Sequence, residues 1–322
     1  MSDVSIQFEL WKQCNNFCEF CYLTKEQTTF VSDETKLENL KKVNTLIDEY
    51  FESNLEQIKA IGFLGGEFFQ GQMNDPFVKK EFYELCEKCF KLINEDRIRD
   101  FWCYCTLTIG DQKDLYDLVE LFDKTVKDKE KHKFWIQVSY DKQGRFNQPG
   151  KFENWDYHML NLQKYPFICF NVTSIMTESF LQAVLKGELD LNKFQEKYKN
   201  HFFLKQANPF HSTTKEEILA KLPWFFPKRK TYLQFLDKLK HESPFLFKEL
   251  LDITLRADYM YNSLEGSKQD EIDPQVRNKE TWNETHNEII DKCGHIKNYQ
   301  CYSDSDACML CDYFKIRDNK ED

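Results

Sequence analysis

The sequence predicts an α/β protein built around a parallel β-sheet. Six short apolar runs have the length and composition of strands, and amphipathic stretches with helical periodicity separate them. Strands that alternate with helices are joined by right-handed crossovers, which place consecutive strands parallel in one sheet. The expected strands are residues 4–11, 59–64, 100–109, 133–140, 166–175 and 201–206. The expected helices between them are residues 34–51, 76–94, 111–126, 154–164 and 178–199.

The composition is that of a folded chain with a sizeable core. Of the 322 residues, 41% are hydrophobic and 16% are aromatic, which excludes global disorder. The net charge of -10 argues against broad nonspecific binding to nucleic acid, because phosphate contacts need a basic face. No apolar run approaches the ~18 residues of a membrane helix, and no N-terminal secretory signal is recognisable. We therefore expect a cytoplasmic protein with no membrane partner.

Three cysteines near the N-terminus carry the strongest functional signal in the chain. Cys14, Cys18 and Cys21 follow the first expected strand with the spacing C-x3-C-x2-C. Thiolates hold iron–sulfur clusters, and a four-iron cluster normally takes four of them. Three thiolates would therefore leave one iron open to bind a small ligand and pass an electron to it. Buried free cysteines are the alternative, but the polar neighbours Asn15 and Asn16 argue against it.

A second motif, Gly65-Gly66-Glu67, directly follows the second expected strand. Glycine lets a backbone approach a ligand closely, and a carboxylate accepts hydrogen bonds from an ammonium group. Taken alone, the tripeptide would be an ordinary turn. Its position one βα unit after the cysteines favours a ligand-binding loop instead.

The two motifs together resemble the signature of the radical S-adenosylmethionine (SAM) superfamily. The aromatic Phe20 before the third cysteine matches that family's pattern, and we include it among the cofactor-binding candidates. Phe68 and Phe69 stand where the family usually continues to a proline, which is a small departure. The resemblance covers about residues 4–210 and implies a partial (β/α)6 barrel, in agreement with the six expected strands.

The resemblance also implies an enzymatic activity and its cofactors. The three cysteines would hold a [4Fe-4S] cluster whose open iron binds SAM, and the Gly-Gly-Glu loop would bind the amino group of SAM. The reduced cluster would cleave SAM to methionine and a 5'-deoxyadenosyl radical, which takes a hydrogen atom from the substrate. An external electron donor such as flavodoxin or ferredoxin would be a partner. The protein would bind, orient and shield the cofactor.

Polar residues near the ends of the fourth and fifth expected strands are further candidates. Ser139 and Asp141 share a strand face, Arg145 follows closely, and Asn171 lies in the fifth strand. Ligands of parallel α/β folds bind outside the carboxyl ends of the strands. By the resemblance, these residues would contact the ribose or carboxylate of SAM. A polar strand end that meets only solvent is the alternative.

Strand alternation assigns the two faces of the third expected strand. Trp102, Tyr104, Thr106 and Thr108 would line a polar interior. Two further cysteine pairs are expected to be core packing, because one lies in an apolar helical stripe and the other on the opposite, helix-facing side of this strand. These pairs are Cys86 with Cys89 and Cys103 with Cys105.

The C-terminal region carries a second cysteine group. Four thiolates can complete a tetrahedral zinc site or hold a second four-iron cluster. We expect one auxiliary metal site there, with a [4Fe-4S] cluster favoured over zinc and free thiols as the remaining possibility. The placement is similar to SPASM or twitch extensions of radical SAM enzymes, although the spacing fits neither pattern closely. The candidate ligands are Cys293, Cys301, Cys308 and Cys311, with His295 as a possible replacement for one of them.

The expected organisation is a radical SAM core over residues 1–212 and a small helical, cysteine-rich, metal-binding extension over residues 213–322. The motifs do not identify the substrate. The auxiliary site favours a peptide or protein by analogy, and a nucleotide or nucleic-acid base is the second possibility. A different class of function would be a non-enzymatic binding protein that uses zinc to staple its cysteine groups.

Overall fold

The structure is a computed structural model that describes residues 4–16, 18, 28–142, 144–146, 148–199, 201–206, 229–244 and 246. The chain divides into two compact units, which are described separately. The first comprises Met1–Thr173 and Gln195–His201, and the second comprises Ser174–Phe194 and Phe202–Asp322. Most of the expected extension lies outside the described residues, so the domain boundary at 212/213 stays a prediction.

The first unit is a parallel sheet whose strands alternate with helices. Its strands are β1 (Ser5–Glu9), β2 (Ile58–Leu64), β3 (Ile98–Tyr104), β4 (Phe134–Ser139) and the greater part of β5 (Ile168–Met176). Each strand pairs in parallel with the next one along the chain. The connecting helices are α1 (Asp33–Ser53), α2 (Pro76–Asn94), α3 (Lys113–Thr125) and α4 (Lys151–Leu162). The expected α/β class with a parallel sheet is confirmed.

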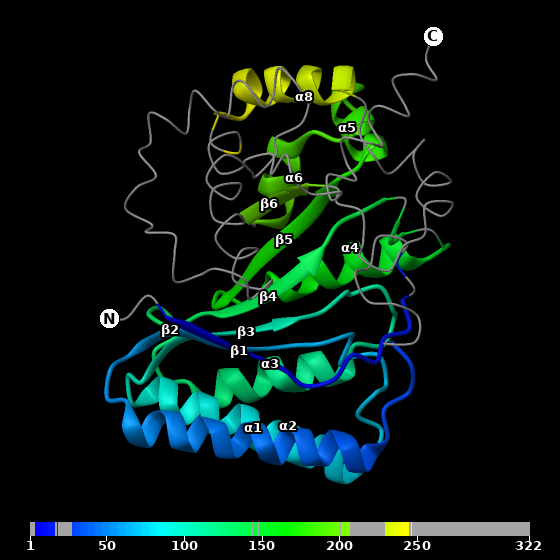
Figure 1. The fold of residues 1–322 in the computed structure, drawn as a ribbon. Coiled ribbons are helices and arrows are strands. Elements are labelled where there is room, and N and C mark those ends of the chain that lie inside the picture. Colours follow the sequence, from blue (N-terminus) through cyan, green and yellow to red (C-terminus); the bar gives the residue numbers. More distant parts are fainter. Residues whose placement is uncertain are drawn as a thin grey trace, which may run out of the picture. The chain divides into compact units, whose positions relative to one another are not determined.

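Figure 1 shows α1, α2 and α3 together on one side of strands β1 to β3. Their starts are encoded locally. The Ser32 hydroxyl accepts a hydrogen bond from the Thr35 N–H at the start of α1, and Asp33 lies in the first turn. At the start of α2, the Asp75 carboxylate accepts from two backbone N–H groups, and Pro76 occupies the first helical position.

Phenylalanine rings fill the space between the sheet and these helices. Phe101 in β3 lies 5.0 Å from Phe90 of α2 and 5.2 Å from Phe134 of β4, measured between ring centroids. Phe90 also lies 5.0 Å from Phe122 of α3. All four rings are fully buried, and edge-to-face pairs of this kind add to the stabilisation from burial. Cys86, Cys89, Cys103 and Cys105 are buried too, as expected from their apolar stripe and strand face.

The third expected strand is shorter than the sequence pattern indicated. It ends at Tyr104, and Leu107 has a positive φ of 56°, so the chain leaves the sheet before the last expected residues. Thr106 and Thr108 are therefore not on a strand face; they are buried in the loop that follows β3. In the sequence, apolar and polar residues alternate to the end of the expected strand at residue 109, but the strand itself ends at Tyr104.

The second unit contains the greater part of the strand β6 (His201–Gln206) and the helix α8 (Arg229–Glu242). The helix α5 (Glu178–Leu185) packs against α8, with Phe180 and Phe235 6.3 Å apart. The buried Glu178 carboxylate accepts from the Thr231 hydroxyl at 2.8 Å.

The expectation of one helix over residues 178–199 is wrong. The chain forms α5 and a separate α6 (Leu191–Tyr198). Gly187 has a φ of 74° and ends the first helix, as glycine commonly does at a helix C-terminus. In the described part of the chain, no helix is both long enough and apolar enough to span a membrane.

Candidate functional site

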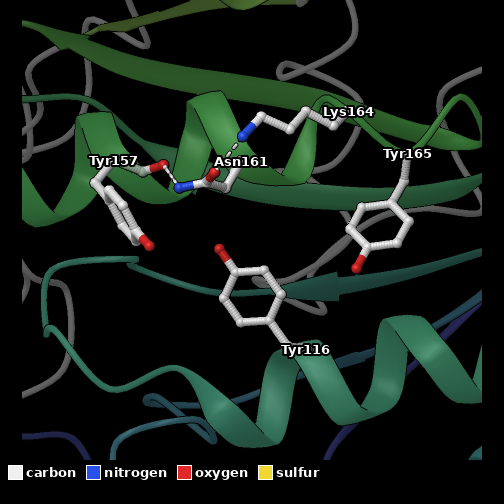
Figure 2. Close-up of a pocket in the computed structure, with 5 residues that line it drawn as sticks. All are labelled: Tyr116, Tyr157, Asn161, Lys164 and Tyr165. Carbon is white, nitrogen blue, oxygen red and sulfur yellow. Dashed lines mark hydrogen bonds between the residues drawn. The ribbon is translucent and has the colours of Figure 1, made fainter.

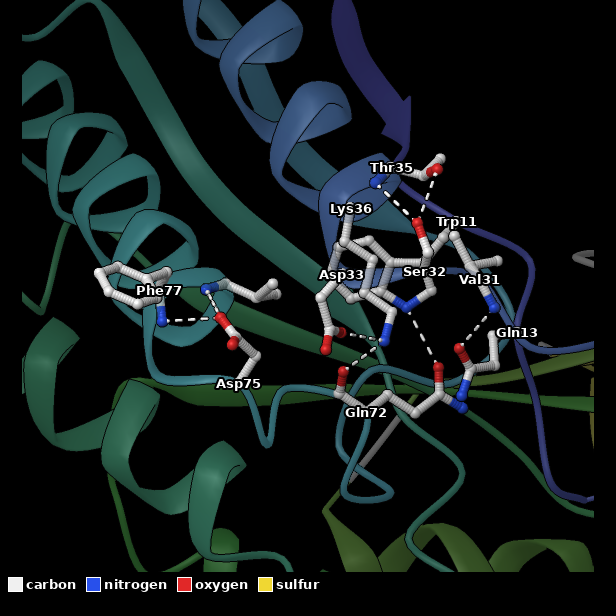
Figure 3. A network of polar contacts seen from close by, with 11 residues as sticks. Trp11, Gln13, Val31, Ser32, Asp33, Thr35, Lys36, Gln72, Asp75 and Phe77 are labelled. Carbon is white, nitrogen blue, oxygen red and sulfur yellow. Dashed lines mark hydrogen bonds and ion pairs between the residues drawn. The ribbon is translucent and has the colours of Figure 1, made fainter.

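The loop that carries the cysteines is closed at its base by hydrogen bonds. The Cys14 N–H donates to the Thr28 carbonyl at 3.2 Å, and the Val31 N–H donates to the Gln13 side chain at 3.0 Å. Figure 3 shows the second of these contacts beside the start of α1. Cys14 and Cys18 are half-buried free thiols. Phe20 and Cys21 lie outside the described residues.

The same loop packs backbone to backbone against the Gly-Gly-Glu loop. The Gly66 N–H donates to the Trp11 carbonyl at 2.9 Å, and the Glu67 N–H donates to the Gln13 carbonyl at 3.0 Å. A Cβ at Gly65 would lie only 2.1 Å from the Trp11 carbonyl oxygen, and one at Gly66 would lie 2.1 Å from that of Gln13. The two glycines therefore allow the loops after β1 and β2 to touch. The sequence analysis predicted that the two glycines contact a ligand and did not predict this structural role.

A buried lysine fixes these two loops to α1. Lys36 Nζ donates to the Gln72 carbonyl at 2.9 Å and to Asp33 at 3.1 Å. The indole N–H of Trp11 donates to the Gln72 side chain at 3.1 Å. Figure 3 shows Trp11, Lys36 and Gln72 meeting at this point. The β1 loop, the β2 loop and the first turn of α1 thus form one hydrogen-bonded block.

Glu67 is a deeply buried acidic residue of the candidate site, with 2% of its surface exposed. Its carboxylate accepts from the Phe69 N–H at 3.2 Å and from the Thr106 N–H at 2.5 Å. Burial raises the pKa of Glu67, and hydrogen bonds from Thr106 and Phe69 together with the charge of Arg145 act against this rise. Glu67 therefore joins the β2 loop to the β3 loop.

Arg145 brings a third loop to the same place. It follows β4, is 9% exposed, and its charge lowers the pKa of both Glu67 and Cys14. The pKa of Cys14 is nevertheless raised to about 11, chiefly by burial and further by Glu67 and Cys18. A hydrogen bond from the Asn16 backbone N–H to the Cys14 sulfur opposes that rise. Cys14, Glu67 and Arg145 thus converge from the carboxyl ends of β1, β2 and β4.

The remaining predicted strand-end residues separate into two positions. Ser139 and Asn171 are half-buried on one face of the sheet, in register with Thr173 and Gln137. Asp141 lies beyond the end of β4 and does not share that strand face. Its carboxylate accepts from the Gly144 N–H, so that it stabilises the turn that carries Arg145. 

A chain of side-chain hydrogen bonds, which we call the polar chain, connects the β2 and β3 loops to the cysteine loop. The Asn15 N–H donates to Gln70 Oε1 at 3.2 Å, and Gln70 Nε2 donates to Thr106 Oγ1 at 3.4 Å. Thr106 Oγ1 lies 3.1 Å from Thr108 Oγ1, which donates to Asn16 Oδ1 at 2.8 Å. Sequence analysis placed Thr106 and Thr108 in a polar interior and did not single out Gln70 at all.

A separate hollow of about 350 Å³ lies between α3 and α4. Figure 2 shows tyrosine hydroxyls directed into it and Lys164 bonded to Asn161. Behind it, His158 Nε2 lies 3.0 Å from the Ile109 carbonyl and must carry the proton, so that Nδ1 accepts from the Tyr116 hydroxyl at 3.1 Å. The lining includes no member of the polar chain and consists of Tyr116, Tyr157, Asn161, Lys164 and Tyr165.

The described residues contain no group of three or more His, Cys, Asp or Glu side chains arranged to hold a metal. That statement does not cover the predicted ligand sets, because Cys21 and the C-terminal candidates lie outside the described residues. These candidates are Cys293, His295, Cys301, Cys308 and Cys311.

No protein-family model and no curated protein matches the chain. The fold and site together define an α/β protein with a polar, largely buried site at the carboxyl ends of its parallel strands.

Proposed function

We propose that the chain is a radical SAM enzyme. Cys14, Cys18 and Cys21 hold a [4Fe-4S] cluster, and bound SAM is cleaved so that hydrogen is taken from a substrate. The observation that carries the proposal is the packing of the cysteine loop against the Gly-Gly-Glu loop at the carboxyl ends of β1 and β2, where the Glu67 N–H donates to the Gln13 carbonyl at 3.0 Å. The charge of Arg145, from the loop after β4, acts on both Cys14 and Glu67. Ligands bind at this edge in parallel α/β folds, and the three side chains come from loops far apart in the sequence.

The described residues fit a cluster. Cys14 and Cys18 are free thiols, half-buried on one short loop, and the Asn16 backbone N–H already donates to the Cys14 sulfur. The side-chain Nδ2 of Asn16 is buried without a hydrogen-bond partner. Protein N–H groups directed at sulfur are part of iron–sulfur ligation. A cluster bound there would supply the electron that cleaves SAM.

The strand order supports the partial (β/α)6 barrel that the proposal requires. In doubly wound sheets the strand order reverses at a switch point and helices cover both faces. Here strands β1 to β5 follow in sequence order, and α1, α2 and α3 share one side. The opposite face carries half-buried side chains at alternate positions of β4 and β5, as expected of a barrel interior. They include Trp135, Gln137, Ser139, Cys169, Asn171 and Thr173.

Within this proposal, the chain's own residues bind and orient SAM. Gly65 and Gly66 hold the β2 loop against the cysteine loop, so that Glu67 is set beside Cys14. The Glu67 carboxylate, which accepts from the Phe69 and Thr106 N–H groups, is proposed to accept also from the SAM ammonium group. Arg145 is proposed to balance the carboxylate of SAM. Ser139 and Asn171, on the interior face, are proposed to contact its ribose, and Asp141 orients the turn before Arg145.

The substrate class proposed is a peptide or protein, with a nucleotide or nucleic-acid base as the alternative. Flavodoxin or ferredoxin is the kind of electron donor required, and a cytoplasmic setting suits an exposed iron site. The C-terminal cysteines are proposed to hold one auxiliary metal, a [4Fe-4S] cluster or zinc.

Metal analysis and product formation test the proposal directly. After anaerobic reconstitution, we expect about four irons per chain from the N-terminal site, and about eight if the auxiliary site also holds a cluster. Reduced protein incubated with SAM should release 5'-deoxyadenosine. A protein that takes up zinc alone, and that forms no 5'-deoxyadenosine, would instead be a zinc-stapled binding protein.

A further inference from the structure

Asn16 lies between Cys14 and Cys18, and three of its four polar groups are already held. Its backbone N–H donates to the Cys14 sulfur, and its carbonyl accepts from Lys151 Nζ at 3.3 Å. Its side-chain Oδ1 accepts from the Thr108 hydroxyl at 2.8 Å. Only 4% of the residue is exposed. The position of Asn16 is therefore fixed by the protein itself.

The polar chain ends at the oxygen of the Asn16 amide, and the nitrogen of that amide is left over. The Asn15 backbone N–H can only donate, so the Gln70 atom beside it is the carbonyl oxygen, and Gln70 Nε2 must donate to Thr106. Thr106 Oγ1 lies 3.1 Å from Thr108 Oγ1, and the Thr108 hydroxyl donates to Asn16 Oδ1 at 2.8 Å.

The chain ends on an unfilled donor. Asn16 Nδ2 has no hydrogen-bond partner among the described residues. An unsatisfied buried N–H costs about 1–3 kcal/mol, and native proteins contain few of them. The sulfur atoms of Cys14 and Cys18 belong to residues two positions away on either side, and the backbone of Asn16 already contacts the first of them.

We infer that Asn16 is a positioning residue whose Nδ2–H donates to a sulfur atom of the iron–sulfur cluster. This inference rests on the proposed function. A hydrogen bond to sulfur stabilises the more negative, reduced state and so raises the reduction potential. Each link of the polar chain polarises the next, which strengthens the final donor. The β2 and β3 loops therefore influence the reduction potential of the cluster.

The test is an anaerobic redox titration of the reconstituted cluster, followed by electron paramagnetic resonance. Asn16→Leu removes the donor at nearly constant shape. We expect its one-electron reduction equilibrium to shift about tenfold towards the oxidised form, which is a potential about 59 mV more negative. Asn15→Leu is the matched control, because the Asn15 side chain is exposed and only its backbone enters the polar chain. Its potential should equal that of the wild type.

A second variant covers the case in which Asn16→Leu does not fold. Thr108→Val keeps Asn16 but removes the hydroxyl that fixes its Oδ1, so we expect a smaller shift in the same direction. Iron and sulfide are measured in every preparation. A wild-type protein that holds no cluster overturns both the proposed function and this inference. A wild type that holds a cluster, with unchanged potentials in Asn16→Leu and Thr108→Val, overturns the inference alone.

Discussion

Six of the seven described cysteines of the first unit occupy two contrasting environments. Cys14 and Cys18 are half-buried on a loop at the carboxyl edge of the sheet. Four others, which we call the core thiols, are at most 3% exposed between the sheet and α2. The core thiols include a C-x2-C pair, and both of its members are fully buried residues of α2. Spacing alone therefore does not identify a ligand. The core thiols are Cys86, Cys89, Cys103 and Cys105.

The two environments differ in the neighbouring groups that lower the pKa of a thiol and so oppose the effect of burial. Burial raises the pKa of Cys86 and Cys103 well above the ordinary value, and neighbouring thiols or Glu67 raise it further. Burial also raises the pKa of Cys14, but there the Asn16 N–H and the charge of Arg145 favour the thiolate. A metal ligand must be deprotonated. At Cys14 two groups oppose the effect of burial on the pKa, whereas at Cys86 and Cys103 none does.

The largest expected effect separates the two environments by metal content. Replacing Cys14, Cys18 and Cys21 with Ala should remove about four irons per chain and abolish 5'-deoxyadenosine formation. The matched change, Cys86→Ala with Cys89→Ala, removes only packing atoms and should leave the iron content at the wild-type level. Equal iron loss in both proteins would show that the contrast is not one of metal binding.

Next in size is the effect of Glu67 on stability. Glu67→Ala leaves the buried N–H groups of Phe69 and Thr106 without an acceptor, so we expect the free energy of unfolding to fall by about 2–4 kcal/mol. Affinity for SAM should also fall about tenfold. Glu9→Ala, at an exposed position of β1, should change stability by less than about 0.5 kcal/mol. Denaturant unfolding measures the free energy of unfolding of the two variants. Equal values for Glu67→Ala and Glu9→Ala would contradict a structural role for the Glu67 carboxylate.

A smaller effect comes from placing a hydroxyl in each environment. Cys103→Ser buries a more polar group at a fully buried position, and should lower the free energy of unfolding by about 1–3 kcal/mol without loss of iron. Cys18→Ser, on the half-buried loop, should lower it by less than about 1 kcal/mol but reduce iron binding. Iron loss in Cys103→Ser, together with normal iron binding but a larger loss of stability in Cys18→Ser, would contradict this contrast.

The smallest expected effect is a dependence on pH near the polar chain. Burial lowers the pKa of His158, which donates to the Ile109 carbonyl in the β3 loop. Its folded pKa lies below the unfolded one, so its contribution is complete above about pH 6.5 and is lost as the pH falls through the folded value. We expect the free energy of unfolding to fall as the pH is lowered below about 6.5.

The control for this pH dependence lies in the second unit. His158→Gln keeps one donor and one acceptor and should flatten the profile, whereas His241→Gln replaces a side chain that is 70% exposed and should not. Stability measured by urea unfolding at several pH values distinguishes them. An unchanged profile in His158→Gln would mean that other groups carry the acid sensitivity.

Much of the fold was predictable, because local chemistry encodes it. Apolar runs bounded by polar segments located the six strands, and the helix α2 was predicted with its observed limits of Pro76–Asn94. Asp75 and Pro76 mark its start in the sequence itself. The break at Gly187 was missed because hydrophobic periodicity continued on both sides of it. Gly187 ends α5 by adopting a left-handed backbone conformation, which the pattern of hydrophobic residues does not reveal.

The sequence by itself determined which residue types gather at the carboxyl ends of the strands, since motif position along a βα unit fixes that edge. Only the tertiary structure decided what they contact there. It set Gly66 against the β1 loop and Glu67 on the Thr106 N–H, and it closed the polar chain from Gln70 to Asn16. These bonds join loops that the sequence separates by tens of residues. No local pattern records them, because hydrogen-bond partners are chosen by proximity in space and not by spacing along the chain.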